Sequence, residues 1–320
     1  MEGAARVTIV RAGPSTCPSV MYCAHAAREP VVSGTIAEIE AEQVTPAVAE
    51  HGEGPVWDAR SGRLLSVDMH RGDLLLVDHD GSLERRHVGD LLATVRPRTQ
   101  GGWVVGLARG FGLLDDDGGE AARSLGELWP DPSIRMNDGG CDPAGGFWCG
   151  SMDLDAAPGR GALYRLAPDG SVATVLTDLT ISNGLCWSPD GSHAYYVDSG
   201  TGGVDVLTID LDAPAVMDRR RFVDVEGGTP DGLTVDADGG VWVALYAGSA
   251  VHRYTPTGTL DLVVRVPTSN PTACAFGGPD LDELWITTSA QGAGAPDGRA
   301  GALYRCRPGI RGLEPLPYQG

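Results

Sequence analysis

The sequence has 320 residues, with 46 glycines, 22 prolines and only 6% aromatic residues, a composition typical of many short segments joined by tight turns. Hydrophobic residues make up 42% of the chain, which provides for a substantial core and excludes a disordered protein. The formal net charge of −19 disfavours nucleic acids and anionic membranes as partners and favours neutral or cationic ligands. Its simplest role is to keep the protein soluble.

The first 34 residues are predicted to form a loosely ordered N-terminal extension. They mix Pro, Ser, Cys and Arg without periodicity, and they lack the uninterrupted apolar run of a signal peptide. No apolar run in the chain is long enough to span a bilayer, and the predicted location is the cytoplasm. The seven cysteines include no CxxC pair and predict no zinc–cysteine site. Cys141 and Cys149 flank a turn and could approach each other, but small reduced core residues are the favoured interpretation.

Residues 35–320 contain six copies of a turn rich in Asp, Pro and Gly, each leading into a short strand with Trp or Tyr. The segment before them, 36–50, contains helix formers but is short and is expected to lead directly into the first unit. The copies lie at Gly54–Asp68, Gln100–Leu107, Asp142–Gly150, Ser188–Asp198, Asp236–Leu245 and Gly278–Thr287.

Polar residues at comparable positions in the copies reveal the length of the repeat. Glu53, Asn137, Asn183 and Asp231 are separated by 84, 46 and 48 residues, and the first interval is about two repeat units. A repeat of this length with about four short strands is the signature of a propeller blade. The predicted fold is therefore all-β, a six-bladed β-propeller with four-stranded antiparallel blades around a central channel. A sandwich or lectin-like barrel would not repeat one unit six times, and a seven-bladed propeller would need another copy.

These four polar residues are predicted to lie just before the innermost strands, where the blades converge on one axis. Two carboxylates and two amides would form an all-oxygen site suited to Ca²⁺, Mg²⁺ or Mn²⁺, with Zn²⁺ as another candidate. Asn-Gly and Asp-Gly are also common tight-turn pairs, whereas Glu53 is not a turn former. Asp68, Asp198 and Asp236 recur at strand ends and are predicted to be turn or blade-locking residues.

Other catalytic signatures are absent from the sequence. It contains no Gly-x-Ser-x-Gly, no His-Glu-x-x-His and no phosphate-binding Gly-Lys-Ser/Thr loop. The seven histidines are scattered, and His51, although close to Glu53, is interpreted as a turn or surface residue. A Ser-His-Asp hydrolase is therefore disfavoured.

Over nearly all of residues 35–320 the chain resembles the SMP-30/gluconolactonase/luciferin-regenerating enzyme family, which includes regucalcin and bacterial sugar lactonases. The individual motifs are short, and their joint occurrence carries the resemblance. They are Glu53-Gly-Pro-Val-Trp, Arg135-Met-Asn-Asp-Gly with Asp142-Pro-Ala-Gly and Gly150-Ser-Met, Ser182-Asn-Gly-Leu-Cys-Trp-Ser-Pro-Asp, and Pro230-Asp-Gly-Leu.

The resemblance implies a site for one divalent metal ion (Ca²⁺, Zn²⁺, Mn²⁺ or Mg²⁺) together with a substrate pocket. The implied metal ligands are Glu53, Asn183 and Asp231. The implied substrate contacts are Arg135, Asn137 and Asp155. Some members carry a Glu where this chain has Asp155, so the sugar-hydroxyl contact here would be made by a shorter side chain. From the residues alone, Arg135 is nearly as well explained as an ion-pair residue at a blade edge.

The same resemblance implies a lactonase, a carboxylic ester hydrolase that opens a small sugar or aldonolactone to the hydroxy acid with metal-activated water. Asp231 would also accept the proton of that water. Two other functions stay open: a related metal-dependent esterase or phosphotriesterase on the same propeller, and a non-catalytic calcium-binding propeller. Retention of Arg135 and Asn137 beside the ligand set favours an enzyme, because a pure scaffold needs only the blade turns.

Overall fold

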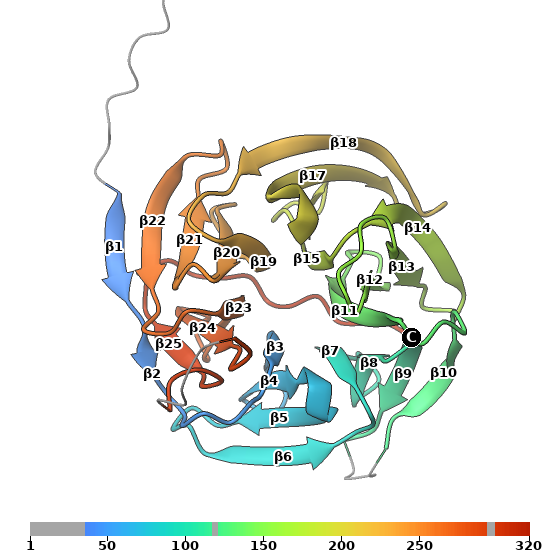
Figure 1. The fold of residues 1–320 in the computed structure, drawn as a ribbon, viewed down its shortest axis with the longest axis horizontal. Helices are drawn as coiled ribbons and strands as arrows, with labels where there is room; N and C mark the ends of the chain where they lie inside the picture. The colour runs from blue at the N-terminus through green and yellow to red at the C-terminus, as the bar shows by residue number, and fades with distance from the viewer. Residues whose placement is uncertain (1–35, 117–120, 293–297) are drawn as a thin grey trace, which may run out of the picture. The chain divides into compact units, whose positions relative to one another are not determined.

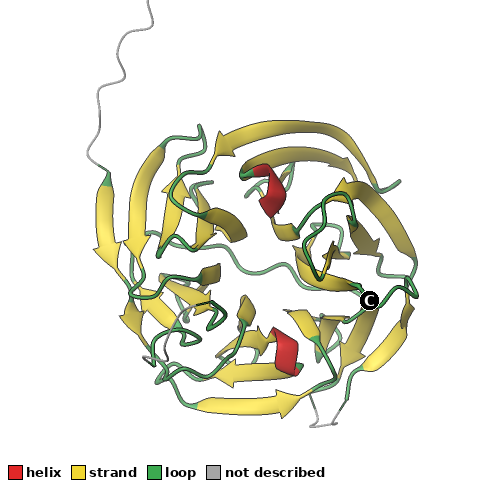
Figure 2. Ribbon diagram, viewed as in Figure 1, coloured by secondary structure: helices red, strands yellow, loops and turns green. Residues whose placement is uncertain are grey.

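The structure, a computed structural model, describes residues 36–116, 121–292 and 298–320. These residues form six sheets arranged around a central channel (Figure 1). The predicted six-bladed all-β propeller is therefore confirmed. Within the described ranges the helical segments are two short 3₁₀ turns, η1 (Met69–Arg71) and η2 (Ser199–Thr201) (Figure 2). The N-terminal extension predicted for residues 1–34 lies outside the described residues.

Each blade begins with a strand that faces the channel and continues outward through antiparallel neighbours. The inner strands are β3 (Gly52–Asp58), β7 (Leu92–Pro97), β11 (Ile134–Cys141), β15 (Ser182–Trp187), β19 (Thr229–Val235) and β23 (Pro271–Gly277). The second strands are β4 (Arg63–Asp68), β8 (Trp103–Leu107), β12 (Phe147–Asp153), β16 (Ala194–Asp198), β20 (Val241–Tyr246) and β24 (Glu283–Thr288). The third strands are β5 (Asp73–Val77), β9 (Gly110–Leu114), β13 (Gly161–Leu166), β17 (Gly203–Asp210), β21 (Ala250–Tyr254) and β25 (Tyr304–Cys306). The outer strands of the first five blades are β6 (Leu83–His87), β10 (Arg123–Glu127), β14 (Val172–Leu179), β18 (Ala215–Asp224) and β22 (Leu260–Arg265).

The ring closes through the segment that precedes the first blade. Strand β1 (Ala37–Glu40) pairs in parallel with β22 and adds a fifth strand to the fifth blade. Strand β2 (Glu42–Gln43) pairs with β25 and supplies the outer strand of the sixth blade. The expectation that residues 36–50 lead directly into the first blade is therefore wrong. These pairings join opposite ends of the chain, and they cover sheet edges that would otherwise be open.

The recurring aromatic residues fill the space between neighbouring blades. Trp148, Trp242 and Trp285, on the second strands of three blades, are fully buried. Trp242 packs edge-on against Phe276 of the next blade, with 5.5 Å between ring centroids. Cys141 and Cys149 are buried and free, as the core interpretation predicted, and burial raises the pKa of Cys141 to about 12. In the described part of the chain, no helix is long and apolar enough to cross a membrane.

The inner strands carry irregularities where they pair with the second strands. Such a bulge re-aims side chains and bends the strand. The register breaks after Glu53 in β3, after Met136 in β11, after Ser182 in β15 and after Pro230 in β19. The predicted site residues therefore lie at bulges within the innermost strands, not just before them. The Asn183-Gly184 pair is part of such a bulge rather than a tight turn. Position 184 has no room for a larger residue, because a Cβ there would lie 2.5 Å from the backbone nitrogen of Leu233.

Two carboxylates at the ends of second strands hold the chain where it enters the inner strands. Asp68 Oδ1 accepts hydrogen bonds from the backbone N–H groups of Glu50 and His51, at 3.0 and 3.1 Å. Asp198 Oδ1 accepts from the N–H of Ile181 at 2.9 Å. Asp68 and Asp198 are thus the locking residues that their position predicted, and they fix the backbone directly before the site residues.

Candidate metal and substrate site

Three predicted metal ligands lie near the beginnings of three inner strands. Glu53 on β3, Asn183 on β15 and Asp231 on β19 are 2%, 4% and 6% exposed. Asn183 lowers the pKa of the Asp231 carboxyl, against the larger effect of burial. Asn183 Oδ1 and Asp231 Oδ1 are nevertheless buried without a hydrogen-bond partner among the described residues. Buried acceptors without partners are costly, and a bound cation would satisfy both.

The carboxyl groups of this cluster repel one another when charged. Burial first, and then the charges of Asp231 and Asp138, raise the pKa of Glu53 well above its ordinary range. Burial and the charge of Asp138 do the same to the pKa of Asp231. A divalent cation between these groups would replace this repulsion with attraction. The electrostatics therefore fit a metal site made of hard oxygen donors.

The chemistry of this set differs from a site built from His, Cys, Asp and Glu alone. No group of three or more such side chains placed to hold a metal ion occurs in residues 36–116, 121–292 and 298–320. The set here combines two carboxylates with the carboxamide oxygen of Asn183, and its donors are all oxygens. Oxygen-only sites suit Ca²⁺, Mg²⁺ and Mn²⁺ better than soft metals.

A hydrogen-bond chain through η2 fixes the orientation of the Asn183 amide. Ser199 Oγ donates to the Pro230 carbonyl at 2.7 Å. Its proton is then committed, so it can only accept from Asn183, whose Nδ2 lies 3.0 Å away. The amide nitrogen must therefore face Ser199, which leaves Oδ1 as the free acceptor. Sequence reasoning missed Ser199 because it lies in a turn of another strand pair, 16 residues further along the chain.

Two of the three predicted substrate residues, Arg135 and Asn137, meet on β11. Arg135 donates through one terminal nitrogen to Asn137 Oδ1 at 2.7 Å and to the Met136 carbonyl at 2.9 Å. Asn137 Nδ2 donates to the Ser182 carbonyl of the next blade at 2.9 Å. Burial lowers the pKa of Arg135, while the charges of Glu53 and Asp231 raise it. Arg135 therefore belongs to the electrostatic environment of Glu53 and Asp231.

Asp155 lies apart from the buried cluster. It follows β12 in a turn, at the end of the blade where Arg135 pairs with Met152. Its side chain is exposed, and its backbone N–H donates to Asp153 Oδ1 at 2.9 Å. This position corresponds to the rim of the site. Contact between Asp155 and a substrate stays a prediction.

Asp138 and His51 add to the site and were not predicted. Asp138 directly follows Asn137 and is 4% exposed; its carboxylate lies 3.7 Å from Arg96. The Arg-Met-Asn-Asp-Gly motif carried this signal, since a second polar residue follows the amide at the bulge. His51 is buried, so its interpretation as a turn or surface residue is wrong.

The environment of His51 combines polar neighbours from opposite ends of the chain. Its Nδ1 lies 2.8 Å from Ser289 Oγ, and its Nε2 lies 3.8 Å from Glu53 Oε1. Its ring centroid is 5.0 Å from that of His70 on η1. Burial, then the charges of His70 and Arg135, lower the pKa of His51 to about 3. The imidazole is thus neutral near pH 7 and can exchange hydrogen bonds without adding charge beside Glu53.

Comparison with known proteins identifies the family. The family described as SMP-30/Gluconolactonase/LRE-like region matches residues 51–290, which include the predicted metal ligands and substrate residues. The chain belongs to this family. It is 34% identical to regucalcin of Homo sapiens over 301 residues, covering 89% of this chain and 100% of regucalcin.

Solved structures of the SMP-30/gluconolactonase family share the fold. A luciferin-regenerating enzyme superposes with a TM-score of 0.78 at 30% identity, over 85% of this chain and 96% of that one. A regucalcin from Agrobacterium tumefaciens, described as a calcium-binding protein, superposes with a TM-score of 0.81 at 25% identity, over 89% and 99% of the two chains. The family thus joins proteins with different names on one propeller, and the chemistry of this chain has to be argued from its own site.

Proposed function

We propose that this protein is a metal-dependent lactonase that hydrolyses a small sugar lactone, with an aldonolactone as the favoured class. The observation that carries the proposal is the pair of buried, unpartnered oxygens, Asn183 Oδ1 and Asp231 Oδ1, beside the carboxyl of Glu53. Membership of a family whose description includes gluconolactonase supports the reaction class. Calcium binding by the Agrobacterium tumefaciens relative supports a hard divalent cation.

Glu53, Asn183 and Asp231 would hold one divalent cation, with Ca²⁺, Mg²⁺, Mn²⁺ and Zn²⁺ as candidates, and it would supply Lewis acidity toward the lactone carbonyl and the attacking water. Asp231 has a second task, which is to accept a proton from that water as it adds to the carbonyl carbon. The ring C–O bond then breaks, and the same proton passes to the departing alkoxide. The product is the open hydroxy acid, and Asp231 is returned to its carboxylate form.

Arg135 and Asn137 are proposed to orient the substrate. Hydrogen bonds to Asn137 Oδ1 and the Met136 carbonyl engage one nitrogen of Arg135. The remaining guanidinium donors can face ring and hydroxyl oxygens of a sugar lactone. Asn137 is itself held by the Ser182 carbonyl, so it also fixes the position of Arg135. Asp155, at the rim, would receive a sugar hydroxyl.

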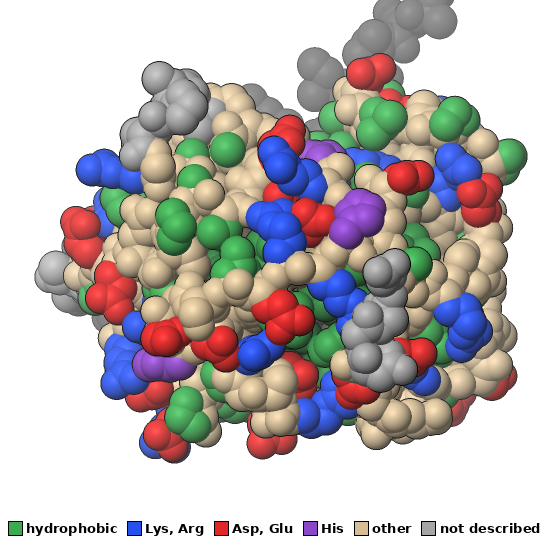
Figure 3. Space-filling view, turned by 90° about the horizontal axis from the view of Figure 1, so that it is seen from below, with side chains coloured by type: hydrophobic (Ala, Val, Ile, Leu, Met, Phe, Trp, Pro, Cys, Tyr) green, Lys and Arg blue, Asp and Glu red, His purple; other side chains and the backbone are tan. Residues whose placement is uncertain are grey.

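The net charge of −19 favours departure of the anionic product. On the face shown in Figure 3, acidic and basic side chains are interspersed rather than gathered into one patch. Repulsion of the hydroxy acid is therefore expected to be a general, salt-screened effect and not the work of one acidic surface. The cytoplasmic location stays part of this proposal.

The test is a pH-indicator assay of metal-stripped protein on a panel of sugar lactones, aliphatic lactones, esters and phosphotriesters. Adding back each of the four metals should restore hydrolysis, with sugar lactones preferred. Asp231→Ala should lower kcat/KM by at least about 10³-fold, because it removes a ligand and the proton acceptor together. Asp238→Ala is the matched control, since Asp238 is an exposed carboxylate close by in the chain.

The same panel separates the alternatives. Metal-restored turnover of phosphotriesters or simple esters without lactone turnover would identify a related esterase on this propeller. Metal binding without turnover of any substrate class would contradict the enzyme and leave a calcium-binding propeller.

A further inference from the structure

A cavity inside the ring is lined mainly by the parts of the inner strands that follow the proposed ligands. Its volume is about 360 Å³. Most of the inner-strand residues that line it lie two to four positions beyond the site residues; Asp138, which lies within the bulge of β11, is an exception. Glu53, Asn183, Asp231 and Arg135 are not among its lining residues. The lining includes Val56, Leu185, Trp187, Leu233, Ala275 and Phe276.

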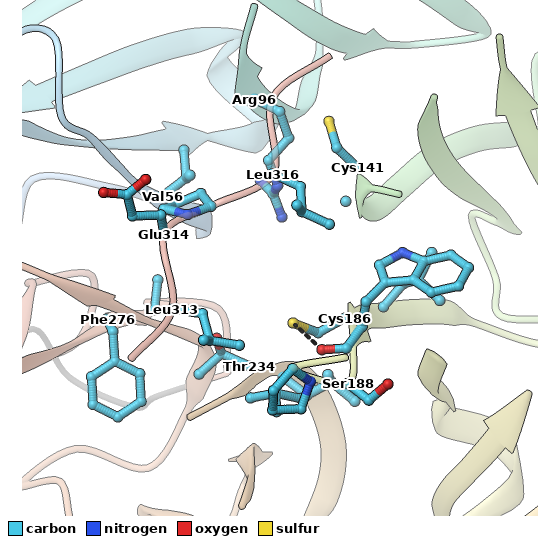
Figure 4. Close-up of a pocket in the computed structure, with 18 of the residues that line it drawn as sticks. Val56, Arg96, Cys141, Cys186, Ser188, Thr234, Phe276, Leu313, Glu314 and Leu316 are labelled. Carbon is cyan, nitrogen blue, oxygen red and sulfur yellow. Dashed lines mark hydrogen bonds between the residues drawn. The ribbon is translucent and has the colours of Figure 1, made fainter. Parts of the chain in front are cut away.

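The C-terminal segment forms one wall of this cavity. It crosses the middle of the ring (Figure 1), and Leu313, Glu314 and Leu316 border the open space in Figure 4. Backbone hydrogen bonds hold it on both sides of the channel. Gly312 donates to the Leu281 carbonyl at 2.8 Å, and Tyr318 donates to the Pro97 carbonyl at 2.9 Å. The wall is therefore tied to the blades, and the cavity is formed in advance of any ligand.

The charges bordering the cavity do not call for a charged ligand. Arg96 and Asp138 lie 3.7 Å apart and compensate each other. Arg96 also donates to Thr94 Oγ1 at 2.9 Å. Asp190 and Glu314, the remaining carboxylates of the lining, are exposed to solvent. Most other lining side chains are apolar, so an ion would lose hydration without gaining a counter-charge.

One polar atom of the lining has no partner. Trp187 is 4% exposed, and its indole Nε1 is buried without a hydrogen-bond partner among the described residues. Trp148 and Trp242 differ, because their Nε1 groups donate to Asp142 and Asp236 at 2.7 and 2.8 Å. A buried N–H without an acceptor is costly. Nε1 of Trp187 has almost no exposed surface, so a ligand oxygen would pair with it once the indole turns toward the cavity.

We propose that this cavity binds a small, uncharged and mainly apolar molecule with one hydrogen-bond acceptor, which pairs with Trp187 Nε1. A dry cavity of about 150 Å³ holds benzene, so the present one has room for roughly a dozen non-hydrogen atoms. The inference does not depend on the lactonase proposal, because Trp187 has no role in the proposed metal binding or hydrolysis. Asp138 lines the cavity and also acts electrostatically on Glu53 and Asp231.

The experiment uses 1-indanone and indane as probes, measured by titration calorimetry on the full chain. The two bicyclic molecules differ by one carbonyl oxygen and contain no ester. Wild-type protein should bind both, with 1-indanone tighter. Trp187→Phe should weaken 1-indanone by about 5-fold, the usual value of one neutral hydrogen bond, and leave indane unchanged. Trp285→Phe is the matched control, because Trp285 is buried with an unpartnered Nε1 but does not line the cavity.

Two further variants locate the probe. Ala275→Leu fills the cavity and should weaken both probes by more than about 10-fold, with an unchanged melting curve as the sign of a folded protein. Asp231→Asn alters a residue that does not line the cavity and should leave both affinities unchanged. The proposal is overturned if neither probe binds wild type, if Trp187→Phe and Trp285→Phe behave alike toward 1-indanone, or if Asp231→Asn removes binding.

Discussion

Two carboxylates at opposite ends of one strand have opposite environments. Asp231 lies near the start of β19 and Asp236 directly after its end, and both are buried. Asp236 Oδ2 accepts from Trp242 Nε1 and Arg253 Nε, both at 2.8 Å, and its Oδ1 accepts from the Gly240 N–H at 2.8 Å. Asp231 Oδ1 has no partner among the described residues. The same strand thus carries Asp231, with one oxygen left without a hydrogen bond, and is followed by Asp236, both of whose oxygens accept hydrogen bonds.

The third blade repeats the satisfied end, whereas the side chains at its bulge, Asn137 and Asp138, are hydrogen-bonded. Asp142 follows the end of β11 and accepts from Trp148 Nε1 at 2.7 Å and Arg165 Nε at 2.6 Å. Asn137 and Asp138 occupy the bulge at the other half of the same strand. The difference teaches that hydrogen bonding which holds the blade is completed at one end, whereas binding capacity is kept open at the other.

The largest effect is expected on the unfolding free energy, from a substitution of Asp236, whose carboxylate oxygens are hydrogen-bonded within the blade. Asp236→Asn removes the charge that Arg253 faces and exchanges an acceptor for a donor near Trp242 Nε1. Loss of one partner of a buried ion pair costs about 3 kcal/mol or more. Urea unfolding followed by tryptophan fluorescence measures it. Asp238→Asn, in the same turn but exposed, should change the unfolding free energy by less than about 0.5 kcal/mol. Equal stability of the two variants would contradict the locking role.

The next effect concerns the residue that orients Asn183. Ser199→Ala removes the acceptor of Asn183 Nδ2, so the amide is free to turn Oδ1 away from the channel. Metal affinity should fall by roughly 10- to 100-fold, as for other residues that hold a ligand in place. Calorimetric titration with Ca²⁺ and Mn²⁺ measures the change. Ser199→Thr keeps a hydroxyl and should recover most of the affinity. An unchanged affinity in Ser199→Ala would remove Asn183 from the ligand set.

A smaller effect is expected from pH on the metal affinity of the site that contains Glu53 and Asp231. Glu53 and Asp231 have raised pKa values in the metal-free protein, so protons compete with the cation at higher pH than for ordinary carboxylates. Affinity should therefore rise with pH. As the pH is lowered, it should begin to fall at a higher pH than for a site of ordinary carboxylates, by up to about 10-fold per pH unit for each proton released. Calorimetry at pH 7 in buffers of different ionisation enthalpy counts those protons. An affinity that falls only in the pH range where ordinary carboxylates take up protons would contradict the raised pKa values.

The sequence predicted the fold because its locking residues recur locally. Asp142 and Trp148 are six residues apart, as are Asp236 and Trp242, and a short-range pattern of this kind can be read without knowing the tertiary structure. The proposed ligands Glu53, Asn183 and Asp231 could be selected for the same reason, since each belongs to a short motif with a following glycine. That the glycine marks a bulge was not read from the sequence, because the same dipeptide also forms tight turns.

Features that depend on distant pairing were not predictable. Gln43 of β2 pairs with Tyr304 of β25, and the buried His51 lies against Ser289 of the sixth blade. No local pattern in residues 36–51 encodes those partners. Ser199 is a similar case, since a serine in a turn acquires its role only when blades four and five meet. The apolar cavity also requires the C-terminal segment to return across the channel.

The smallest effect is expected on KM, from substitutions of Asp155. They test whether a residue outside the buried cluster contacts the substrate. Its carboxylate is exposed, so a hydrogen bond to a sugar hydroxyl competes with water and contributes little. Asp155→Ala should raise KM for an aldonolactone by about 2- to 3-fold with kcat unchanged, and Asp155→Glu, which reaches further, should lower it. Steady-state kinetics measures both, with Asp169→Ala as an exposed control from the turn after β13. A 10-fold loss of kcat in Asp155→Ala would instead place this side chain at the reacting atoms, and the rim would then be part of the catalytic centre.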